Sequence, residues 1–137
     1  MTETWSSRGI STRRWTPLAD LRDTSLWRGD VIRLPHHPEI GPDSRPVDLL
    51  IYELWGYDQK LGLMITKGYK AGMPLFYAPK ESQGEGKLSL ETSWLHANWN
   101  KWFVYNYELD ENENPVPMPM TGTLVRRNSR PAPRLNV

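Results

Sequence analysis

Residues 92–107 read TSWLHANWNKWFVYNY, and they are the most informative stretch of the chain. They hold three of the seven tryptophans and six of the fifteen aromatic residues. The large side chains recur at spacings of three and four, which places them on one face of a helix: Trp94, Leu95, Asn98, Trp99, Trp102 and Phe103. A buried aromatic side chain removes about 150–250 Å² from water, so this helix can anchor a small core. We expect Thr92 or Ser93 to cap its first turn.

The alternative use of this aromatic face is to bind a partner. The three tryptophans span most of the helix, and Trp102 lies near its end. Interfaces are enriched in tryptophan and tyrosine at their centres. We therefore expect the helix to be mainly core, with Trp102 at the rim of an interface. His96 is expected on the exposed side of the helix.

Strands are predicted on both sides of this helix. Apolar, β-branched and aromatic runs bounded by glycine, proline or polar turns lie at 27–34, 47–57, 61–67, 73–78, 104–107 and 121–126. The second and third of these runs are joined by the turn-forming residues 56–59 and predict an antiparallel hairpin. In the second run, Leu49, Ile51, Glu53 and Trp55 share one face. The predicted fold is α+β: a bent antiparallel sheet of four to six strands, open or barrel-like, packed on one aromatic-rich helix.

Length and composition predict one domain. The chain has 137 residues, which is the size of a single core. We divide it into a partly ordered lead-in at 1–26, a globular domain at 27–126 and a basic tail at 127–137. No apolar run reaches the roughly 20 residues of a membrane span, and the first residues contain no secretory apolar segment. With no cysteine in the chain, a cytoplasmic location is expected.

Charge is segregated along the chain. Residues 1–14 carry three arginines and one acid, and residues 115–137 carry four arginines and no acid. Residues 15–114 carry ten Lys and Arg against fifteen acids, a net charge of −5. An acidic surface of this kind suits a basic partner, which its field would steer into contact.

Catalytic and metal sites are not expected. The local cluster of His36, His37, Asp30, Glu39 and Asp43 has no familiar zinc spacing, and adjacent side chains diverge. The serines show no nucleophile motif, and the paired acids of residues 108–114 stand on a polar loop. We therefore predict a protein that is not an enzyme and has no metal and no cofactor.

Three blocks of the chain resemble a bacterial family, immunity protein 45. They are RGDVIRL at 28–34, LIYELWGYDQKLGLMITKGYKAG at 50–72 and LSLETSWLHANWNKW at 88–102. Families of this kind belong to polymorphic toxin systems, in which a small cytoplasmic protein binds and neutralises a cognate toxin domain. The resemblance thus implies a stoichiometric, non-catalytic toxin inhibitor, and it carries over no residue roles.

The acidic charge indicates the kind of toxin. Acidic loops would mimic the anionic substrate of a basic, nuclease-like toxin that acts on nucleic acid, and would block its active site. We predict contacts through acidic turns and neighbouring aromatic or basic side chains: Tyr57, Asp58, Tyr69, Lys70, Trp102, Glu108, Asp110, Glu111 and Glu113. The alternative is a small-barrel nucleic-acid-binding module that uses exposed aromatics and the basic ends. The acidic centre makes a nucleic-acid partner the weaker hypothesis.

Overall fold

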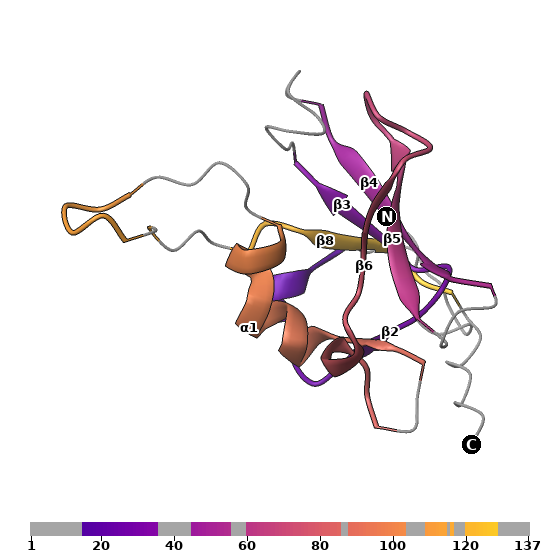
Figure 1. Ribbon diagram of the computed structural model, residues 1–137. Helices are drawn as coiled ribbons and strands as arrows, with labels where there is room; N and C mark the ends of the chain where they lie inside the picture. The colour runs from indigo at the N-terminus through magenta and orange to yellow at the C-terminus, as the bar shows by residue number, and fades with distance from the viewer. Residues whose placement is uncertain are drawn as a thin grey trace.

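The protein forms an open antiparallel sheet with one α-helix on one face (Figure 1). The computed structural model describes residues 15–35, 45–55, 60–85, 88–103, 109–114, 116 and 120–128. Its strands are β1 (Thr16–Pro17), β2 (Ser25–Leu26), β3 (Val31–Leu34), β4 (Val47–Glu53), β5 (Leu61–Lys67), β6 (Pro74–Tyr77), β7 (Leu90–Glu91) and β8 (Thr123–Arg126). The helix is α1 (Thr92–Trp102), and two 3₁₀ turns are η2 (Leu18–Asp20) and η3 (Lys80–Ser82).

Six strands make the main sheet in the order β1-β8-β3-β4-β5-β6. All of its neighbours are antiparallel, and the predicted hairpin is β4 with β5. Register shifts interrupt three ladders, at β3–β8, β4–β5 and β5–β6. Such irregularities increase the local twist and bend a sheet. The bent α+β fold is therefore confirmed. The sheet does not close into a barrel, because β1 and β6 are its two edges.

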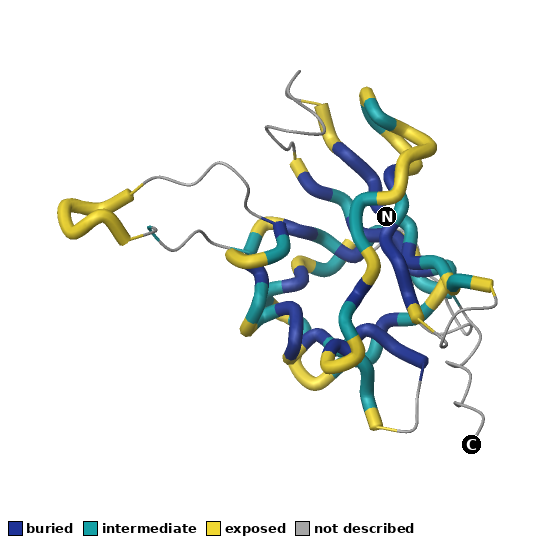
Figure 2. The backbone as a smooth tube through the Cα atoms, in the orientation of Figure 1, coloured by how far each residue is buried: buried dark blue, intermediate teal, exposed yellow. Residues whose placement is uncertain are grey.

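The core lies between the sheet and α1. Alternate residues of β4 and β5 point into it, including Leu49, Ile51, Leu63 and Ile65, all of which are buried. Their period of two is the pattern of a strand with one face against the core. From the helix, Trp94, Leu95, Trp99 and Phe103 complete the buried cluster, and Trp102 packs against it while half exposed. Figure 2 shows this buried centre inside an exposed rim of turns.

Ring contacts tie the helix to the edge strand β6. The Trp99 and Phe103 rings are stacked with centroids 4.1 Å apart. Phe76 of β6 lies 5.0 Å from the Trp102 ring and 5.2 Å from the Phe103 ring. Aromatic pairs at such separations add attraction beyond their buried area. The expectation that the aromatic helix forms the core is confirmed.

The start of the helix differs from the prediction. Its N-cap is Glu91, and no side chain caps the first turn. The Thr92 hydroxyl instead accepts a hydrogen bond from the Thr24 N–H at 2.9 Å, and the Thr92 N–H donates to the Thr24 carbonyl. The threonine is used to hold a distant segment, because that segment pairs as β2 with β7 just before the helix.

His96 is also placed differently from the prediction. Its side chain is half-buried, and its Nε2 lies 3.0 Å from the Leu18 carbonyl and 2.8 Å from the Leu21 carbonyl. Its Nδ1 lies 3.2 Å from a guanidinium nitrogen of Arg22. The side of α1 that looks exposed in the sequence is thus covered by residues 18–22. Leu18 and Leu26 are themselves fully buried, so the described part of the 1–26 segment shares the core of the 27–126 segment.

Candidate partner-binding site

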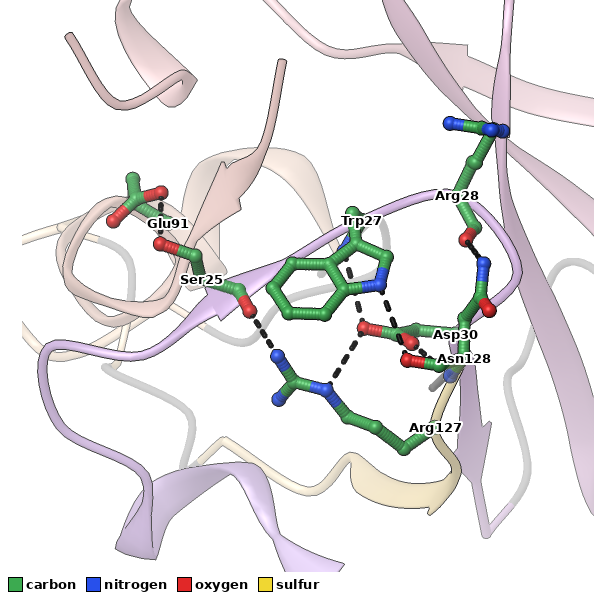
Figure 3. Close-up of polar contacts among 7 residues, drawn as sticks. All are labelled: Ser25, Trp27, Arg28, Asp30, Glu91, Arg127 and Asn128. Atoms are coloured by element: carbon green, nitrogen blue, oxygen red, sulfur yellow. Dashed lines mark hydrogen bonds and ion pairs between the residues drawn. The ribbon is translucent and has the colours of Figure 1, made fainter. Parts of the chain in front are cut away.

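A turn between β2 and β3 is built around one buried carboxylate, as Figure 3 shows. Asp30 has no exposed surface. Its Oδ2 accepts the Trp27 N–H at 3.0 Å, and its Oδ1 accepts the Asn128 N–H at 2.6 Å. Burial raises the pKa of Asp30 above its ordinary value, while these two N–H groups and the Arg127 guanidinium act to lower it. The carboxylate therefore joins the turn to the segment that follows β8.

Arg127 completes this network from the C-terminal side. Its Nε lies 3.6 Å from Asp30 Oδ2, and its NH2 donates to the Ser25 carbonyl at 2.6 Å. The guanidinium carbon lies 4.3 Å from the centroid of the Trp27 ring. One side chain thus contacts an anion, a carbonyl and an aromatic face. This fixes the turn as a rigid support.

The same network positions the backbone around Gly29. The Asn128 side-chain amide donates to the Arg28 carbonyl at 2.7 Å. Gly29 has a φ of +95°, and a Cβ there would lie 2.8 Å from the Asn128 Nδ2. The Gly29 N–H donates to the Ile51 carbonyl at 2.8 Å. Only glycine fits this close approach, which sets the Arg28 side chain beside the end of β4.

A cleft of about 580 Å³ opens between this turn and β4. Its lining includes Arg28, Tyr52, Glu53 and Trp55. An NH1 of Arg28 lies 3.6 Å from a carboxylate oxygen of Glu53, and both side chains are partly exposed. Trp55, two residues beyond the last residue of β4, is 94% exposed. We call this cleft the Trp55 cleft.

Two tyrosines stand beside the Trp55 cleft on the sheet face opposite α1. Gly62 of β5 pairs with Tyr52 on one side and Tyr77 on the other. A Cβ on Gly62 would lie 2.6 Å from the Tyr52 ring, so that ring occupies the space above the glycine. Burial, and then the hydrogen-bonded Tyr77 side chain, raises the pKa of Tyr52 above its ordinary value. The absence of a side chain at Gly62 therefore makes room for the Tyr52 ring, which is hydrogen-bonded to Tyr77.

The predicted acidic residues form a separate exposed turn. Asp110, Glu111 and Glu113 are all exposed, and Figure 2 shows residues 109–114 standing apart from the buried centre. The Asp110 Oδ1 accepts the N–H groups of Asn112 and Asn114, both at 2.9 Å. Asp110 thus shapes the turn, and the carboxylates of Glu111 and Glu113 are presented to solvent.

The other predicted contact residues are not brought to this turn. Tyr69 is 70% exposed in the tight connection after β5, where its neighbour Lys70 has its Nζ 6.0 Å from the ring centroid. Trp102 lies at the end of α1 against Phe76. Three predicted residues fall outside the described part of the chain: Tyr57, Asp58 and Glu108.

The exposure of Trp55 was not predicted. Its position in the sequence placed it on a strand face with Leu49 and Ile51, but β4 ends at Glu53. The turn-forming residues that begin at Gly56 were a signal that the strand stops before them. No local signal indicates the Asp30–Arg127 contact, because its partners are far apart in the sequence.

No group of three or more metal-ligating side chains among the described residues is arranged to hold an ion. Of the histidine cluster considered above, only Asp30 is described, and it is occupied by the Trp27, Asn128 and Arg127 contacts. No helix within the described ranges has the length and hydropathy needed to cross a membrane.

Comparisons with known proteins identify the family. No curated protein and no solved structure matches the chain significantly. The family model for immunity protein 45 matches residues 18–113, which is well over half of the chain. Such immunity proteins are typically non-catalytic, in agreement with the prediction that this chain is not an enzyme. The chain therefore belongs to the immunity protein 45 family.

Proposed function

We propose that this protein binds one cognate bacterial toxin domain in the cytoplasm and blocks it stoichiometrically, without catalysis. The observation that carries the proposal is membership of the immunity protein 45 family over residues 18–113. Inhibition by binding needs a rigid scaffold with an exposed contact surface. The open sheet, the aromatic helix and the buried Asp30 network supply that scaffold.

We further propose that the toxin is basic and acts on nucleic acid. The support is the net charge of −5 over residues 15–114 and the exposed carboxylates of the 109–114 turn. An anionic protein surface can occupy a groove that is built for phosphates, and opposite charge speeds the encounter. In this proposal Glu111 and Glu113 steer the toxin, together with Glu108 and Asp58.

Tyr57, Tyr69, Lys70 and Trp102 remain proposed contact residues. Three of them have the exposure that contact requires: Tyr69 is exposed, and Lys70 and Trp102 are half-buried. They come from separate parts of the fold, the β5–β6 connection and the end of α1.

The experiment is rescue combined with complex formation. A toxin domain encoded beside this gene, which is the arrangement expected for an immunity protein, is expressed in cells with and without this protein, and growth is measured. The purified pair is then analysed by size-exclusion chromatography with light scattering. We expect growth only in the presence of this protein and a one-to-one complex. Cells that die equally in both arms, with no complex formed, would refute the proposal.

A further inference from the structure

We infer that the Trp55 cleft is the principal contact for the toxin, and that it receives an arginine or lysine side chain from the toxin surface. The inference rests on the proposed function and names the part of the molecule that performs it. It starts from one unusual exposure: the Trp55 side chain is 94% exposed. Tryptophan is enriched among the residues that carry most of the binding energy at protein interfaces, so an exposed tryptophan that lines a cleft is a candidate contact residue.

The charged residues beside Trp55 indicate which kind of side chain would cover it. Glu53 is the acid nearest to it in the chain, and it lies on the wall of the same cleft. Its contact with Arg28 is long, at 3.6 Å, and both side chains keep about 40% of their surface in water (44% and 38%). A carboxylate accepts up to about four hydrogen bonds, so Glu53 retains capacity for a second cation.

A basic side chain would contact both the Trp55 ring and the Glu53 carboxylate. Its cationic head lies against the face of an aromatic ring, which attracts cations, while the Glu53 carboxylate accepts its N–H groups. The net charge of −5 over residues 15–114 favours a basic partner for the same surface. An acidic side chain could pair with Arg28, but it would meet Glu53 and the negative face of the indole, and an uncharged one would leave Glu53 without a new partner.

The cleft is held open before the partner arrives. Backbone hydrogen bonds hold its lining residues Gly29 and Ile51: the Gly29 N–H donates to the Ile51 carbonyl, and the Ile51 N–H donates to the Asp30 carbonyl at 3.0 Å. Asn128, another lining residue, holds the Arg28 carbonyl through its side chain. A rigid site loses little conformational freedom on binding, so the contacts made by Trp55 translate into affinity.

The test measures binding of the neighbouring toxin domain, made non-toxic by substitution, to four purified variants. Trp55→Ala removes the ring, Trp55→Phe keeps a weaker aromatic face, and Glu53→Gln removes the charge. Trp15→Ala is the matched control, because Trp15 is also exposed (56%) but lies over Arg33 rather than in this cleft. Circular dichroism and thermal unfolding check that each variant folds like the wild type.

We expect Trp55→Ala to weaken binding at least tenfold and Trp55→Phe to weaken it less. Glu53→Gln should weaken binding and reduce its dependence on salt, and Trp15→Ala should bind like the wild type. If the wild type binds and Trp55→Ala binds within twofold of it, the inference is overturned and the proposed function stands. If only Glu53→Gln is without effect, the basic occupant is overturned. A wild type that neither binds nor rescues overturns both.

Discussion

The Nε of Arg127 lies 3.6 Å from the Oδ2 of Asp30, and the carboxylate of Asp30 has no exposed surface. The two residues come from opposite ends of the described chain. Their contact joins the turn before β3 to the segment after β8, where the Asn128 side chain holds the Arg28 carbonyl at the Trp55 cleft. The stability of the fold and the shape of its candidate site therefore depend on the same network.

Arg127→Ala should lower the free energy of unfolding by about 3 kcal/mol, because it leaves a buried carboxylate with less compensation. It also removes the hydrogen bond to the Ser25 carbonyl and the contact with the Trp27 ring. Urea unfolding followed by circular dichroism measures the change. The control is Arg126→Ala, which alters an exposed neighbour and should change stability by less than about 0.5 kcal/mol. Equal effects of the two substitutions would contradict a role for the Asp30 contact.

The pH dependence of stability should carry the signature of Asp30. Burial raises the pKa of Asp30 in the folded state above 3.8, so the native protein binds its proton more readily than the unfolded chain does. The stability that Asp30 contributes is thus complete below pH 3.8 and is lost as pH rises through the folded-state pKa. Unfolding free energies of the wild type and Asp30→Asn are compared from pH 3 to 7. The difference, wild type minus variant, should fall with rising pH, whereas a rising difference would show a lowered pKa.

Gly62→Ala should destabilise the sheet by about 1–3 kcal/mol, because its methyl group would lie 2.6 Å from the Tyr52 ring. The cost should come from that ring alone. In a Tyr52→Ala background the same substitution should therefore cost much less. A double-mutant cycle from denaturant unfolding gives the coupling energy. A coupling energy near zero would show that the strain lies in the backbone rather than in the contact with the Tyr52 ring.

The tryptophans of α1 should differ in their contribution to stability. Trp99→Ala should cost about 3–5 kcal/mol, because the ring is buried and stacked on Phe103. Trp102→Ala should cost about 1–2 kcal/mol, because only part of that ring is removed from water. Thermal and urea unfolding of both variants provide the measurement. A larger loss for Trp102 would reverse the assignment of core and rim.

The acidic turn should act on the rate of association. Replacing Glu111 and Glu113 with glutamine leaves the Asp110 hydrogen bonds that shape the turn, and removes two exposed charges. We expect association with the toxin to slow by about threefold to tenfold at low salt and by little at high salt. Stopped-flow fluorescence measures the association rate at both salt concentrations. Glu85→Gln removes an exposed charge elsewhere and is the control. An unchanged rate at low salt would remove the turn from the encounter.

Local patterns predicted the central hairpin well, because the alternating apolar residues that determine it lie within its own two strands. The range 61–67 coincides with β5, where apolar residues alternate before Gly68. The edges of the fold were less predictable. β1, β2 and β7 have two residues each, which is too short for any periodicity, and they exist because distant segments pair with them. His96 was misplaced for the same reason, since residues 18–22 cover its side of the helix.

The candidate site was predictable only in part. Charge counts pointed to the acidic turn, which is exposed as expected. Trp55 was missed, because continued alternation past Glu53 suggested burial although the strand ends there. The support under Arg28 needs Asn128 and Asp30 together, and contacts between residues so far apart leave no trace in a local pattern.

The position of β8 determines when the sheet can be completed during synthesis. This strand lies between β1 and β3 although it is the last of the described chain to be synthesised. Until residue 128 has left the ribosome, the pairing of β1 with β8 is incomplete and the Asp30 carboxylate lacks its full contacts with Arg127 and Asn128. Long-range pairing of this kind delays folding relative to local hairpins. A newly made molecule therefore completes the sheet and the Asp30 network only after residue 128 has been translated.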